Sequence, residues 1–409
     1  MSKEKRRVPK LRFPGFTEDW EQRKLGKCVD ISTGYPFDSQ DFNENGEYLV
    51  ITNGNIQENT PFVLNNVGNR IDLDDSLKKY ILDIDDLLIT MDGTVGRVAI
   101  VVNNKLVLAQ RVCRIKSNEP YYIYQLLSKN NFIQSMNKIG HGGTIKHISL
   151  SEISEYQDFY PKSQKERIKI STVLTNCDKL ITLHQRKLNN IKLKKKALLQ
   201  KLFPKNGERY PELRFPGFTD AWEQRKLDDI AKIKTGGGTP KTANPEYWSG
   251  NIPWIQSSDL VEGDIVHVNI NKFINNNALK NSAAKLISRD SIALVTRVGV
   301  GKVAVINQDF TTSQDFLSLS DFDGSDIKFL AYQLYRLMQE NAKVLQGTSI
   351  KGITKTELIE QSISIPSSGQ EQNLISAVLS KIDSIITLHQ RKLEHLQLQK
   401  KALLQQMFV

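Results

Sequence analysis

The segment Leu11-Arg-Phe-Pro-Gly-Phe-Thr-Glu-Asp-Trp-Glu-Gln-Arg-Lys-Leu25 occurs a second time, as Leu213-Arg-Phe-Pro-Gly-Phe-Thr-Asp-Ala-Trp-Glu-Gln-Arg-Lys-Leu227. Residues 11–27 and 213–229 are identical at 13 of 17 positions. A second duplicated segment, 180–203, returns at 385–408 with 16 of 24 positions identical. The blocks between these segments, 28–179 and 230–384, have 152 and 155 residues and share little sequence. This pattern indicates a tandem duplication in which one scaffold presents two different surfaces.

The composition is that of an ordinary globular chain. Its 409 residues favour two to three domains, and its 39% hydrophobic and 25% charged residues are typical of soluble proteins. No apolar run approaches the ~18–20 residues of a membrane span, and the basic start lacks the apolar core of a signal peptide. Cys28, Cys113 and Cys177 have no short spacing, which predicts neither a zinc site nor a disulfide framework. We expect a cytoplasmic protein.

The net charge of +11 suits a polyanionic partner, because neutralising phosphates releases counterions. Residues 1–204 contain 32 basic and 23 acidic residues, a net charge of +9, whereas the remainder contains 24 and 22, a net charge of +2. Charge alone is equally compatible with a basic cytosolic protein that binds no nucleic acid.

The diverged blocks read as mixed α/β structure with short strands. Runs rich in β-branched residues and bounded by Gly, Asn and Asp predict strands: Tyr48–Thr52, Asp86–Thr90, Val98–Val102, Ile252–Ile255, Ser291–Thr296 and Lys302–Ile306. Weak similarities survive between the blocks, at 94–99 against 299–304 and at 143–148 against 348–353. We therefore expect the two interiors to share a fold and to differ in their loops.

The end of each half changes to a heptad period. Positions spaced alternately by four and three residues from Ile170 to Leu202, and from Ile375 to Met407, are apolar in eight of ten cases. Two matching helices of about 40 residues, ~60 Å each, favour an antiparallel coiled coil, because this packing gives homologous halves a pseudo-two-fold axis. The predicted interface residues are Leu174, Ile181, His184, Leu188, Leu198, Leu379, Ile386, His389, Leu393 and Leu403.

Four polar residues interrupt the heptads at matching positions: His184, His389, Lys195 and Lys400. Such residues usually specify register at some cost in stability, and we favour this role over a catalytic or metal-binding one. The fold class is therefore α+β: two similar mixed α/β domains joined by two long helices. The expected organisation is a first domain, first spacer helix, linker, second domain and second spacer helix at 1–160, 161–204, 205–212, 213–365 and 366–409.

Motifs for catalysis are incomplete. Arg297-Val-Gly-Val-Gly-Lys302 lacks the first glycine and the hydroxyl residue of a phosphate-binding loop. Asn244-Pro-Glu-Tyr247 lacks the second proline of the Asn-Pro-Pro-Tyr segment of amino-methyltransferases. The six histidines have no metal-ligand spacing, and Gly236-Gly-Gly-Thr-Pro240 is a flexible turn. These absences favour a binding protein over an enzyme.

The duplicated blocks and helices resemble the specificity (S) subunit of type I restriction–modification systems. The resemblance rests on both Leu-Arg-Phe-Pro-Gly-Phe segments, on Gly237-Gly-Thr-Pro240 with Ile252-Pro-Trp-Ile255, and on Gln185-Arg-Lys-Leu188 with Lys-Lys-Ala-Leu-Leu-Gln at 195–200 and 400–405. The first half departs from this pattern at Thr33-Gly-Tyr-Pro36.

The resemblance implies a non-catalytic subunit in which each variable block is a target-recognition domain that reads half of a bipartite asymmetric site in double-stranded DNA. It implies helices that set the spacing and dock two modification (methyltransferase) subunits, which methylate adenine, with restriction (translocase and nuclease) subunits joining the complex. S-adenosylmethionine, ATP and Mg²⁺ would belong to those partners, and this subunit would hold no cofactor. The alternative from another class is a bivalent adaptor that binds two proteins.

Residues on loops, where polar or basic side chains meet glycines or strand ends, are the candidates for DNA contact. Each of them is also compatible with ordinary solvated surface. They are Asn53, Asn55, Arg97, Lys146 and His147 in the first block, and Lys241, Ser257, Ser258, Arg297, Lys302 and Lys351 in the second.

Overall fold

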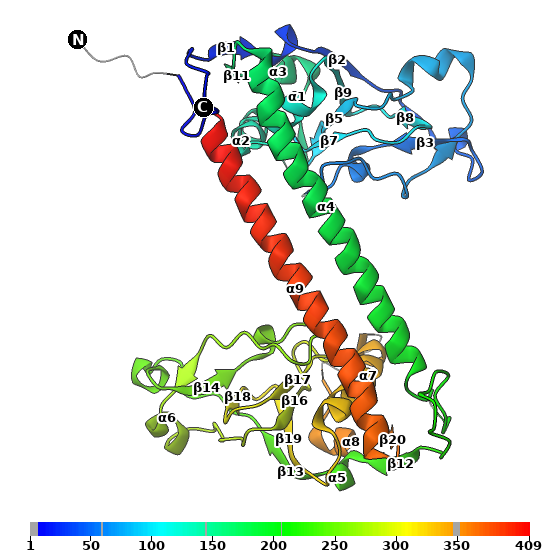
Figure 1. The fold of residues 1–409 in the computed structure, drawn as a ribbon, viewed down its shortest axis with the longest axis vertical. Helices are drawn as coiled ribbons and strands as arrows, with labels where there is room; N and C mark the ends of the chain where they lie inside the picture. The colour runs from blue at the N-terminus through cyan, green and yellow to red at the C-terminus, as the bar shows by residue number, and fades with distance from the viewer. Residues whose placement is uncertain (1–6, 59, 144, 206, 347–351) are drawn as a thin grey trace. The chain divides into compact units, whose positions relative to one another are not determined.

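The structure, a computed structural model, describes residues 7–58, 60–143, 145–205, 207–346 and 352–409. It divides into two compact units: the first unit contains residues 1–186 and 391–409, and the second unit contains residues 187–390. The long helices α4 (Gln164–Lys201) and α9 (Gly369–Met407) each contribute residues to both units (Figure 1). Each unit combines a domain with segments of both long helices.

The first unit contains the strands and helices that precede α4. Its strands are β1 (Glu21–Lys24), β2 (Asp30–Thr33), β3 (Tyr48–Ile51), β4 (Arg70–Ile71), β5 (Leu87–Thr90), β6 (Asp92–Gly93), β7 (Val98–Ile100), β8 (Leu106–Leu108), β9 (Val112–Lys116), β10 (Lys146–His147) and β11 (Gln157–Tyr160). Its shorter α-helices are α1 (Pro120–Leu127), α2 (Asn130–Ile139) and α3 (Leu150–Glu155). Its 3₁₀ turns are η1 (Leu25–Lys27), η2 (Ser39–Asp41), η3 (Asn53–Asn55) and η4 (Asp75–Tyr80).

The second unit repeats this order with small changes. Its strands are β12 (Glu223–Lys226), β13 (Ala231–Gly236), β14 (Ile252–Ile255), β15 (Phe273–Ile274), β16 (Ser291–Val295), β17 (Val303–Ile306), β18 (Thr311–Thr312), β19 (Phe316–Phe322) and β20 (Ser362–Ile365). Its helices are α5 (Leu227–Ile230), α6 (Asn276–Lys280), α7 (Ile327–Gln346) and α8 (Lys355–Ile359), with 3₁₀ turns η5 (Pro245–Trp248) and η6 (Ser257–Asp259).

The sheets of the two units have the same topology. The four-stranded sheet has the order β2-β9-β5-β7 in the first unit and β13-β19-β16-β17 in the second, with all neighbours antiparallel. A three-stranded sheet, β4-β3-β8 or β15-β14-β18, contains one parallel pair in each unit. The first and last strands of each unit also pair with each other, β1 with β11 and β12 with β20. The expectation that the two interiors share a fold is therefore confirmed.

The central strands β5 and β16 are buried on both faces, which explains why their sequences are continuous apolar runs. All residues of β5 and β16 are buried, and successive side chains point to opposite faces. Leu87 and Ile89 pack into the core shared with α1 and α2, whereas Leu88 packs into a second core with β3 and β8. Ile292 and Leu294 on one face, and Ala293 on the other, repeat this division in the second unit.

The duplicated Leu-Arg-Phe-Pro-Gly-Phe segment joins the start of one long helix to the end of the other. Arg12 donates two hydrogen bonds, of 2.7 and 2.9 Å, to the buried carboxylate of Glu166 in the first turn of α4. The backbone N–H of Leu11 donates to the carbonyl of Gln406 near the end of α9 at 2.8 Å. Arg214, Glu371 and Leu213 repeat these contacts with the start of α9 and the end of α4. The duplicated segment therefore forms an ionic clamp between the two long helices within each unit.

An aromatic residue beyond the end of each long helix completes each core. In the first unit, Phe408 packs edge-on against Trp20, with ring centroids 6.0 Å apart, and stacks on Tyr122. In the second unit, Phe203 packs edge-on against Trp222, also at 6.0 Å, and stacks on Phe329. Within each unit the two long-helix segments therefore run antiparallel, because the N-terminal part of one lies with the C-terminal end of the other. The predicted fold class is confirmed.

The ten predicted interface residues on α4 and α9 are all buried or half-buried. The two heptad lysines form ion pairs with aspartates of the opposite helix inside each unit. Lys400 contacts Asp178 at 2.6 Å, and Gln125 donates to the other oxygen of that carboxylate at 2.7 Å. In the second unit Lys195 contacts Asp383 at 2.5 Å, and the Tyr332 hydroxyl donates to Asp383 at 2.6 Å. These lysines therefore satisfy buried carboxylates, which fixes the register of the helices against their domains.

We predict that Lys195→Met destabilises the second unit by about 3–5 kcal/mol, because it leaves the Asp383 carboxylate buried without its cation. Burial raises the pKa of Asp383, and Lys195 opposes this rise. Without Lys195 the folded state keeps the Asp383 proton more strongly than the unfolded state does. The loss of stability should therefore be small in acid and grow as the pH rises above the usual carboxyl pKa of about 3.9.

Urea denaturation at several pH values, followed by tryptophan fluorescence, measures this loss. The matched control is Lys196→Met, which removes the same charge from an exposed position and should change the free energy of unfolding by no more than about 0.5 kcal/mol. Equal, pH-independent losses in both variants would contradict the prediction.

Candidate nucleic-acid interface

Equivalent loops follow the central strand of the three-stranded sheet in each unit. In the first unit η3 follows β3, and the backbone N–H of Thr52 donates to the side-chain oxygen of Asn55 at 2.9 Å. In the second unit η6 follows β14, and the N–H of Gln256 donates to the Asp259 carboxylate at the same distance. Both acceptor residues are buried. The loops therefore have one architecture, held by a short polar side chain that turns back onto its own backbone.

This architecture removes Asn55 from the predicted contact set. Its amide nitrogen donates to the carbonyls of Leu64 and Val67 at 2.9 and 2.7 Å, and its oxygen accepts from Thr52. Asn55 is therefore a loop-forming residue and does not lie on the exposed surface, contrary to the expectation. Asn53 is half-buried and accepts from the N–H of Met91 at 3.3 Å. Ser258 is exposed and Ser257 half-buried on the equivalent loop.

The turns after β5 and β16 bring a second set of predicted residues close to these loops. Gly96 and Gly301 adopt positive φ angles of 82° and 112° just before Arg97 and Lys302. Arg97 lies 3.7 Å from the Glu58 carboxylate, and the ammonium of Lys302 donates to the Ser257 carbonyl at 2.9 Å. Both cations thus connect the sheet turn to the neighbouring loop. Arg297 is exposed, with no hydrogen bond or ion pair among the residues that the structure describes.

The remaining predicted residues lie in different settings. The ammonium of Lys146 donates to the Asn137 carbonyl at the end of α2, so it ties β10 to that helix. Lys241 is exposed, and its carbonyl accepts from the Trp248 ring nitrogen at 3.4 Å. Lys351 lies outside the described residues.

His147 belongs to an exposed cluster with two residues that the sequence analysis missed. His147 Nδ1 lies 2.7 Å from Asp92 Oδ1, and Arg111 Nη1 lies 3.0 Å from Asp92 Oδ2. Arg111 has a φ of 69°, a left-handed conformation that costs a non-glycine residue roughly 1–3 kcal/mol. The only available signal in the sequence was Gln110-Arg111 as a polar break between two β-rich runs. Sequence alone does not bring Asp92, Arg111 and His147 together, because β10 pairs with β6 across more than 50 residues.

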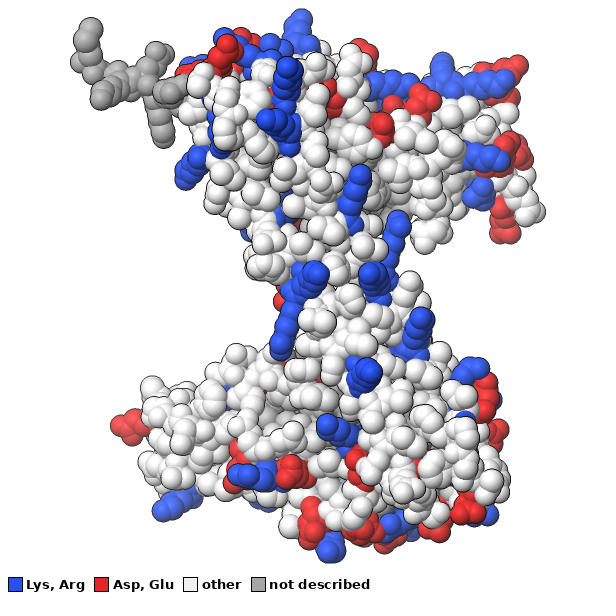
Figure 2. All heavy atoms as spheres, viewed as in Figure 1, with Lys and Arg blue, Asp and Glu red and all other residues white. Residues whose placement is uncertain are grey.

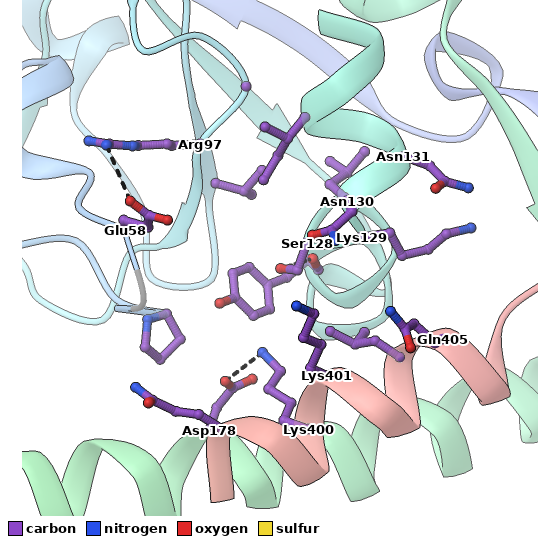
Figure 3. Close-up of a pocket in the computed structure, with 18 of the residues that line it drawn as sticks. Glu58, Arg97, Ser128, Lys129, Asn130, Asn131, Asp178, Lys400, Lys401 and Gln405 are labelled. Carbon is purple, nitrogen blue, oxygen red and sulfur yellow. Dashed lines mark hydrogen bonds and ion pairs between the residues drawn. The ribbon is translucent and has the colours of Figure 1, made fainter. Parts of the chain in front are cut away.

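A groove of about 960 Å³ lies in the first unit between the domain and the helix pair. Figure 3 shows Arg97 and Glu58 on one side of it, with Lys400, Lys401 and Asp178 on the other. In the second unit the equivalent lysine, Lys195, is covered differently. It donates to the Gly263 carbonyl at 2.5 Å and lies 6.0 Å from the Tyr335 ring. Burial raises the pKa of Tyr335 to about 12, so this ring stays neutral.

Basic residues predominate on α4. The segment 162–203 contains 12 basic and 2 acidic residues, whereas 367–408 contains 5 and 3. Figure 2 shows lysine and arginine side chains along this helix. Among the described residues no group of three or more His, Cys, Asp and Glu could hold a metal ion. Within that part of the chain no helix is long and apolar enough to cross a membrane.

Comparison with known proteins identifies the repeat. The family model described as "Type I restriction modification DNA specificity domain" matches residues 17–193 and 219–398. The MjaIX specificity subunit of a type I restriction enzyme from Methanocaldococcus jannaschii is 33% identical over 171 residues, which are 40% of this chain and 38% of that protein. In that match the chain thus spans about two fifths of its relative's length.

Two further matches extend over the whole chain. The MjaVIII specificity subunit from the same organism is 21% identical over 412 residues, 96% of this chain and 92% of that protein. The crystal structure of a type I restriction–modification S subunit from M. genitalium has the same fold, with a TM-score of 0.70 and 14% identity over 98% of this chain and 99% of that one. Because the family model matches both repeats and most of the chain, this protein belongs to the type I restriction–modification DNA specificity domain family.

Proposed function

We propose that this chain is the non-catalytic, DNA-binding specificity subunit of a type I restriction–modification complex. The loop surface of each unit reads one half of a bipartite asymmetric DNA site. The long helices set the spacing of the half-sites and dock two modification subunits, through which restriction subunits join. S-adenosylmethionine, ATP and Mg²⁺ act in those partners.

The observation that carries this proposal is one scaffold with two different sets of loop side chains. Asn53 corresponds to Ser257, Arg97 to Lys302, and Asp92 to Arg297, on elements that have the same order and pairing. A binding protein that reads two unlike half-sites needs this combination of identical frames and unlike contacts. The excess of basic residues supplies the sequence-independent attraction to phosphates.

The exposed apolar residues of the long helices support docking of two copies of one partner. The first unit carries Leu180, Leu183 and Leu398, and the second unit carries the equivalent Ile385, Leu388 and Leu193. Leu183 is 45% exposed, and Leu388, Leu193 and Leu398 are each 65% exposed. Leu180 and Leu183 lie three residues apart and therefore on one face of α4, as Ile385 and Leu388 do on α9, and exposed apolar patches mark interaction surfaces. Since the set occurs once per unit, it fits two identical modification subunits.

Replacing residues 28–160 by the matching block of another specificity subunit tests the reading of half-sites. We expect one half of the methylated site to change while the other half and the spacer stay the same, as measured by mapping methylated adenines in the genome. Binding of the assembled complex to DNA should also weaken steeply with salt. A swap that altered both half-sites together, or a complex without salt-dependent DNA affinity, would favour the adaptor hypothesis.

Leu183→Asp and Leu388→Asp should each release one modification subunit, because a carboxylate cannot be buried unpaired in the apolar interface. Native mass spectrometry of the complex should count one bound copy for each single variant and none for the double variant. Gln200→Asp and Gln399→Asp place the same carboxylate at exposed polar positions of α4 and α9, and both should retain two copies. Two copies on the double leucine variant would disprove this docking surface.

Inserting seven residues after Arg186 in α4 and seven after Arg391 in α9 tests the spacing role. One heptad keeps the a/d pattern and adds ~10.5 Å to each helix. Both insertions fall at or next to the residue at which each helix changes from one compact unit to the other. The DNA spacer should lengthen by about three base pairs at ~3.4 Å each, with both half-sites unchanged. Insertion into α4 alone should break the pairing and abolish methylation. Methylation of only the original spacing by the double insertion would exclude the helices as the ruler.

A further inference from the structure

The turn between β8 and β9 presents an arginine in an unusual conformation. Gln110 and Arg111 are both exposed, and Arg111 has a φ of 69°. Its carbonyl accepts from the N–H of Met91 at 3.2 Å, directly after β5. In the second unit the N–H of Thr296, directly after β16, donates to the Asp315 carbonyl at 2.7 Å. Arg111 and Asp315 are therefore equivalent positions in the two units.

The charges at this edge are exchanged between the units. The first unit has a carboxylate after β5, at Asp92, and a guanidinium on the opposite turn, at Arg111. The second unit has the guanidinium after β16, at Arg297, and the carboxylate on the opposite turn, at Asp315. Each unit thus places one arginine and one acid at the same edge of its four-stranded sheet, with the arginine on a different strand end. Both units thus have one charge of each sign at these positions, but the arginine is on a different strand end, which changes where a guanidinium would meet a ligand.

The Arg111 guanidinium is held on one side and open on the other. Its Nη1 lies 3.0 Å from Asp92 Oδ2 and 3.4 Å from His147 Nδ1, and His147 in turn lies 2.7 Å from the second Asp92 oxygen. Nε and Nη2 make no hydrogen bond to any residue that the structure describes. The side chain is 59% exposed, whereas Asp92 is 20% exposed. A fixed guanidinium with a free Nε–Nη2 edge is arranged for a bidentate contact.

We propose that Arg111 is a base-reading residue of the first unit, that it contacts N7 and O6 of a guanine in the major groove through Nε and Nη2, and that Asp92 is its positioning residue. Arg297 has the corresponding role in the second unit. Arginine pairs with guanine in this bidentate way more often than with any other base. The left-handed backbone at Arg111 fits this role, because strain is kept where it positions a functional group. The inference rests on the proposed function, since it names the residue that gives the first unit its preference for a particular base.

The test uses the complex of the full chain with its modification subunits, and duplexes in which 7-deazaguanine replaces each guanine of the site in turn. This base lacks N7. The unaltered complex should lose about 10- to 100-fold in affinity at one guanine of the first half-site. Arg111→Ala should lower the affinity for the normal site by a similar factor, and it should become insensitive to 7-deazaguanine at that position alone. Arg297→Ala should show the same behaviour at one guanine of the other half-site.

Three further variants separate recognition from folding and charge. Arg111→Gly adopts a positive φ without strain, so its melting temperature should be equal or higher while the discrimination is lost. Asp92→Ala should lower the ratio of specific to random-sequence affinity without lowering random-sequence affinity, because Arg111 is retained but no longer oriented. Lys116→Ala, which removes an exposed cation from the other end of β9, should leave the 7-deazaguanine profile unchanged.

The outcomes distinguish this inference from the proposed function. A complex that binds its methylated site no better than random duplex refutes the proposed function itself. A complex that discriminates, but whose Arg111→Ala variant keeps the full 7-deazaguanine profile, refutes the role of Arg111 alone. A uniform loss of affinity on all duplexes would identify a phosphate contact and would also overturn the base-reading role. A first half-site at which no guanine N7 matters overturns it as well.

Discussion

The bidentate ion pair between an arginine and a buried glutamate occurs once in each unit, and the fold of this chain depends on it. Arg12 with Glu166, and Arg214 with Glu371, connect a segment preceding each domain to the first turn of the helix that follows it. The neighbouring leucine N–H then binds the last turns of the other long helix. A buried glutamate without this partner would carry an uncompensated charge, which costs several kcal/mol. The clamp therefore fixes three segments that lie far apart in sequence, and this explains why its residues survive in both copies.

The difference between buried contacts and exposed loops explains which parts of the repeat diverged. The long-helix ends and the aromatic contacts of Phe408 and Phe203 lie in the cores, and the aspartates of the lysine–aspartate pairs are buried. A change in any of them leaves a cavity or an unpaired charge. The loops after β3 and β14 need only one short polar side chain to hold their shape, Asn55 or Asp259. Their neighbours are free to vary, so the surface can change while the frame persists.

Sequence predicted the elements that are specified by period and composition. The ten residues predicted from the heptads of α4 and α9 lie at buried or half-buried positions. The predicted apolar runs coincide with β3, β5, β7, β14, β16 and β17. It did less well on side chains whose role depends on contacts across the sheet. Asn55 looked like a contact residue because an asparagine before a turn has the same sequence signature whether it faces solvent or its own backbone. Arg111 was missed because only the register of β6 with β10, and of β5 with β9, brings it to Asp92 and His147.

The two units differ in the surroundings of the buried lysine–aspartate contact and in the charges at the ends of the strands. These differences show how a duplicated surface can change while the fold is kept. In the second unit the Gly263 carbonyl covers Lys195, and the rings of Tyr332 and Tyr335 flank it. In the first unit Lys400 keeps its aspartate but borders an open groove beside Arg97. At the sheet edge, Asp92 and Arg111 are replaced by Arg297 and Asp315, while the backbone hydrogen bond that joins the two strand ends is kept. Because the strands are held by main-chain bonds and by buried apolar residues, the charged side chains at their ends carry little of the stability. They are the part of the molecule that can be exchanged, and in a specificity subunit an exchange at that edge would alter which bases are read.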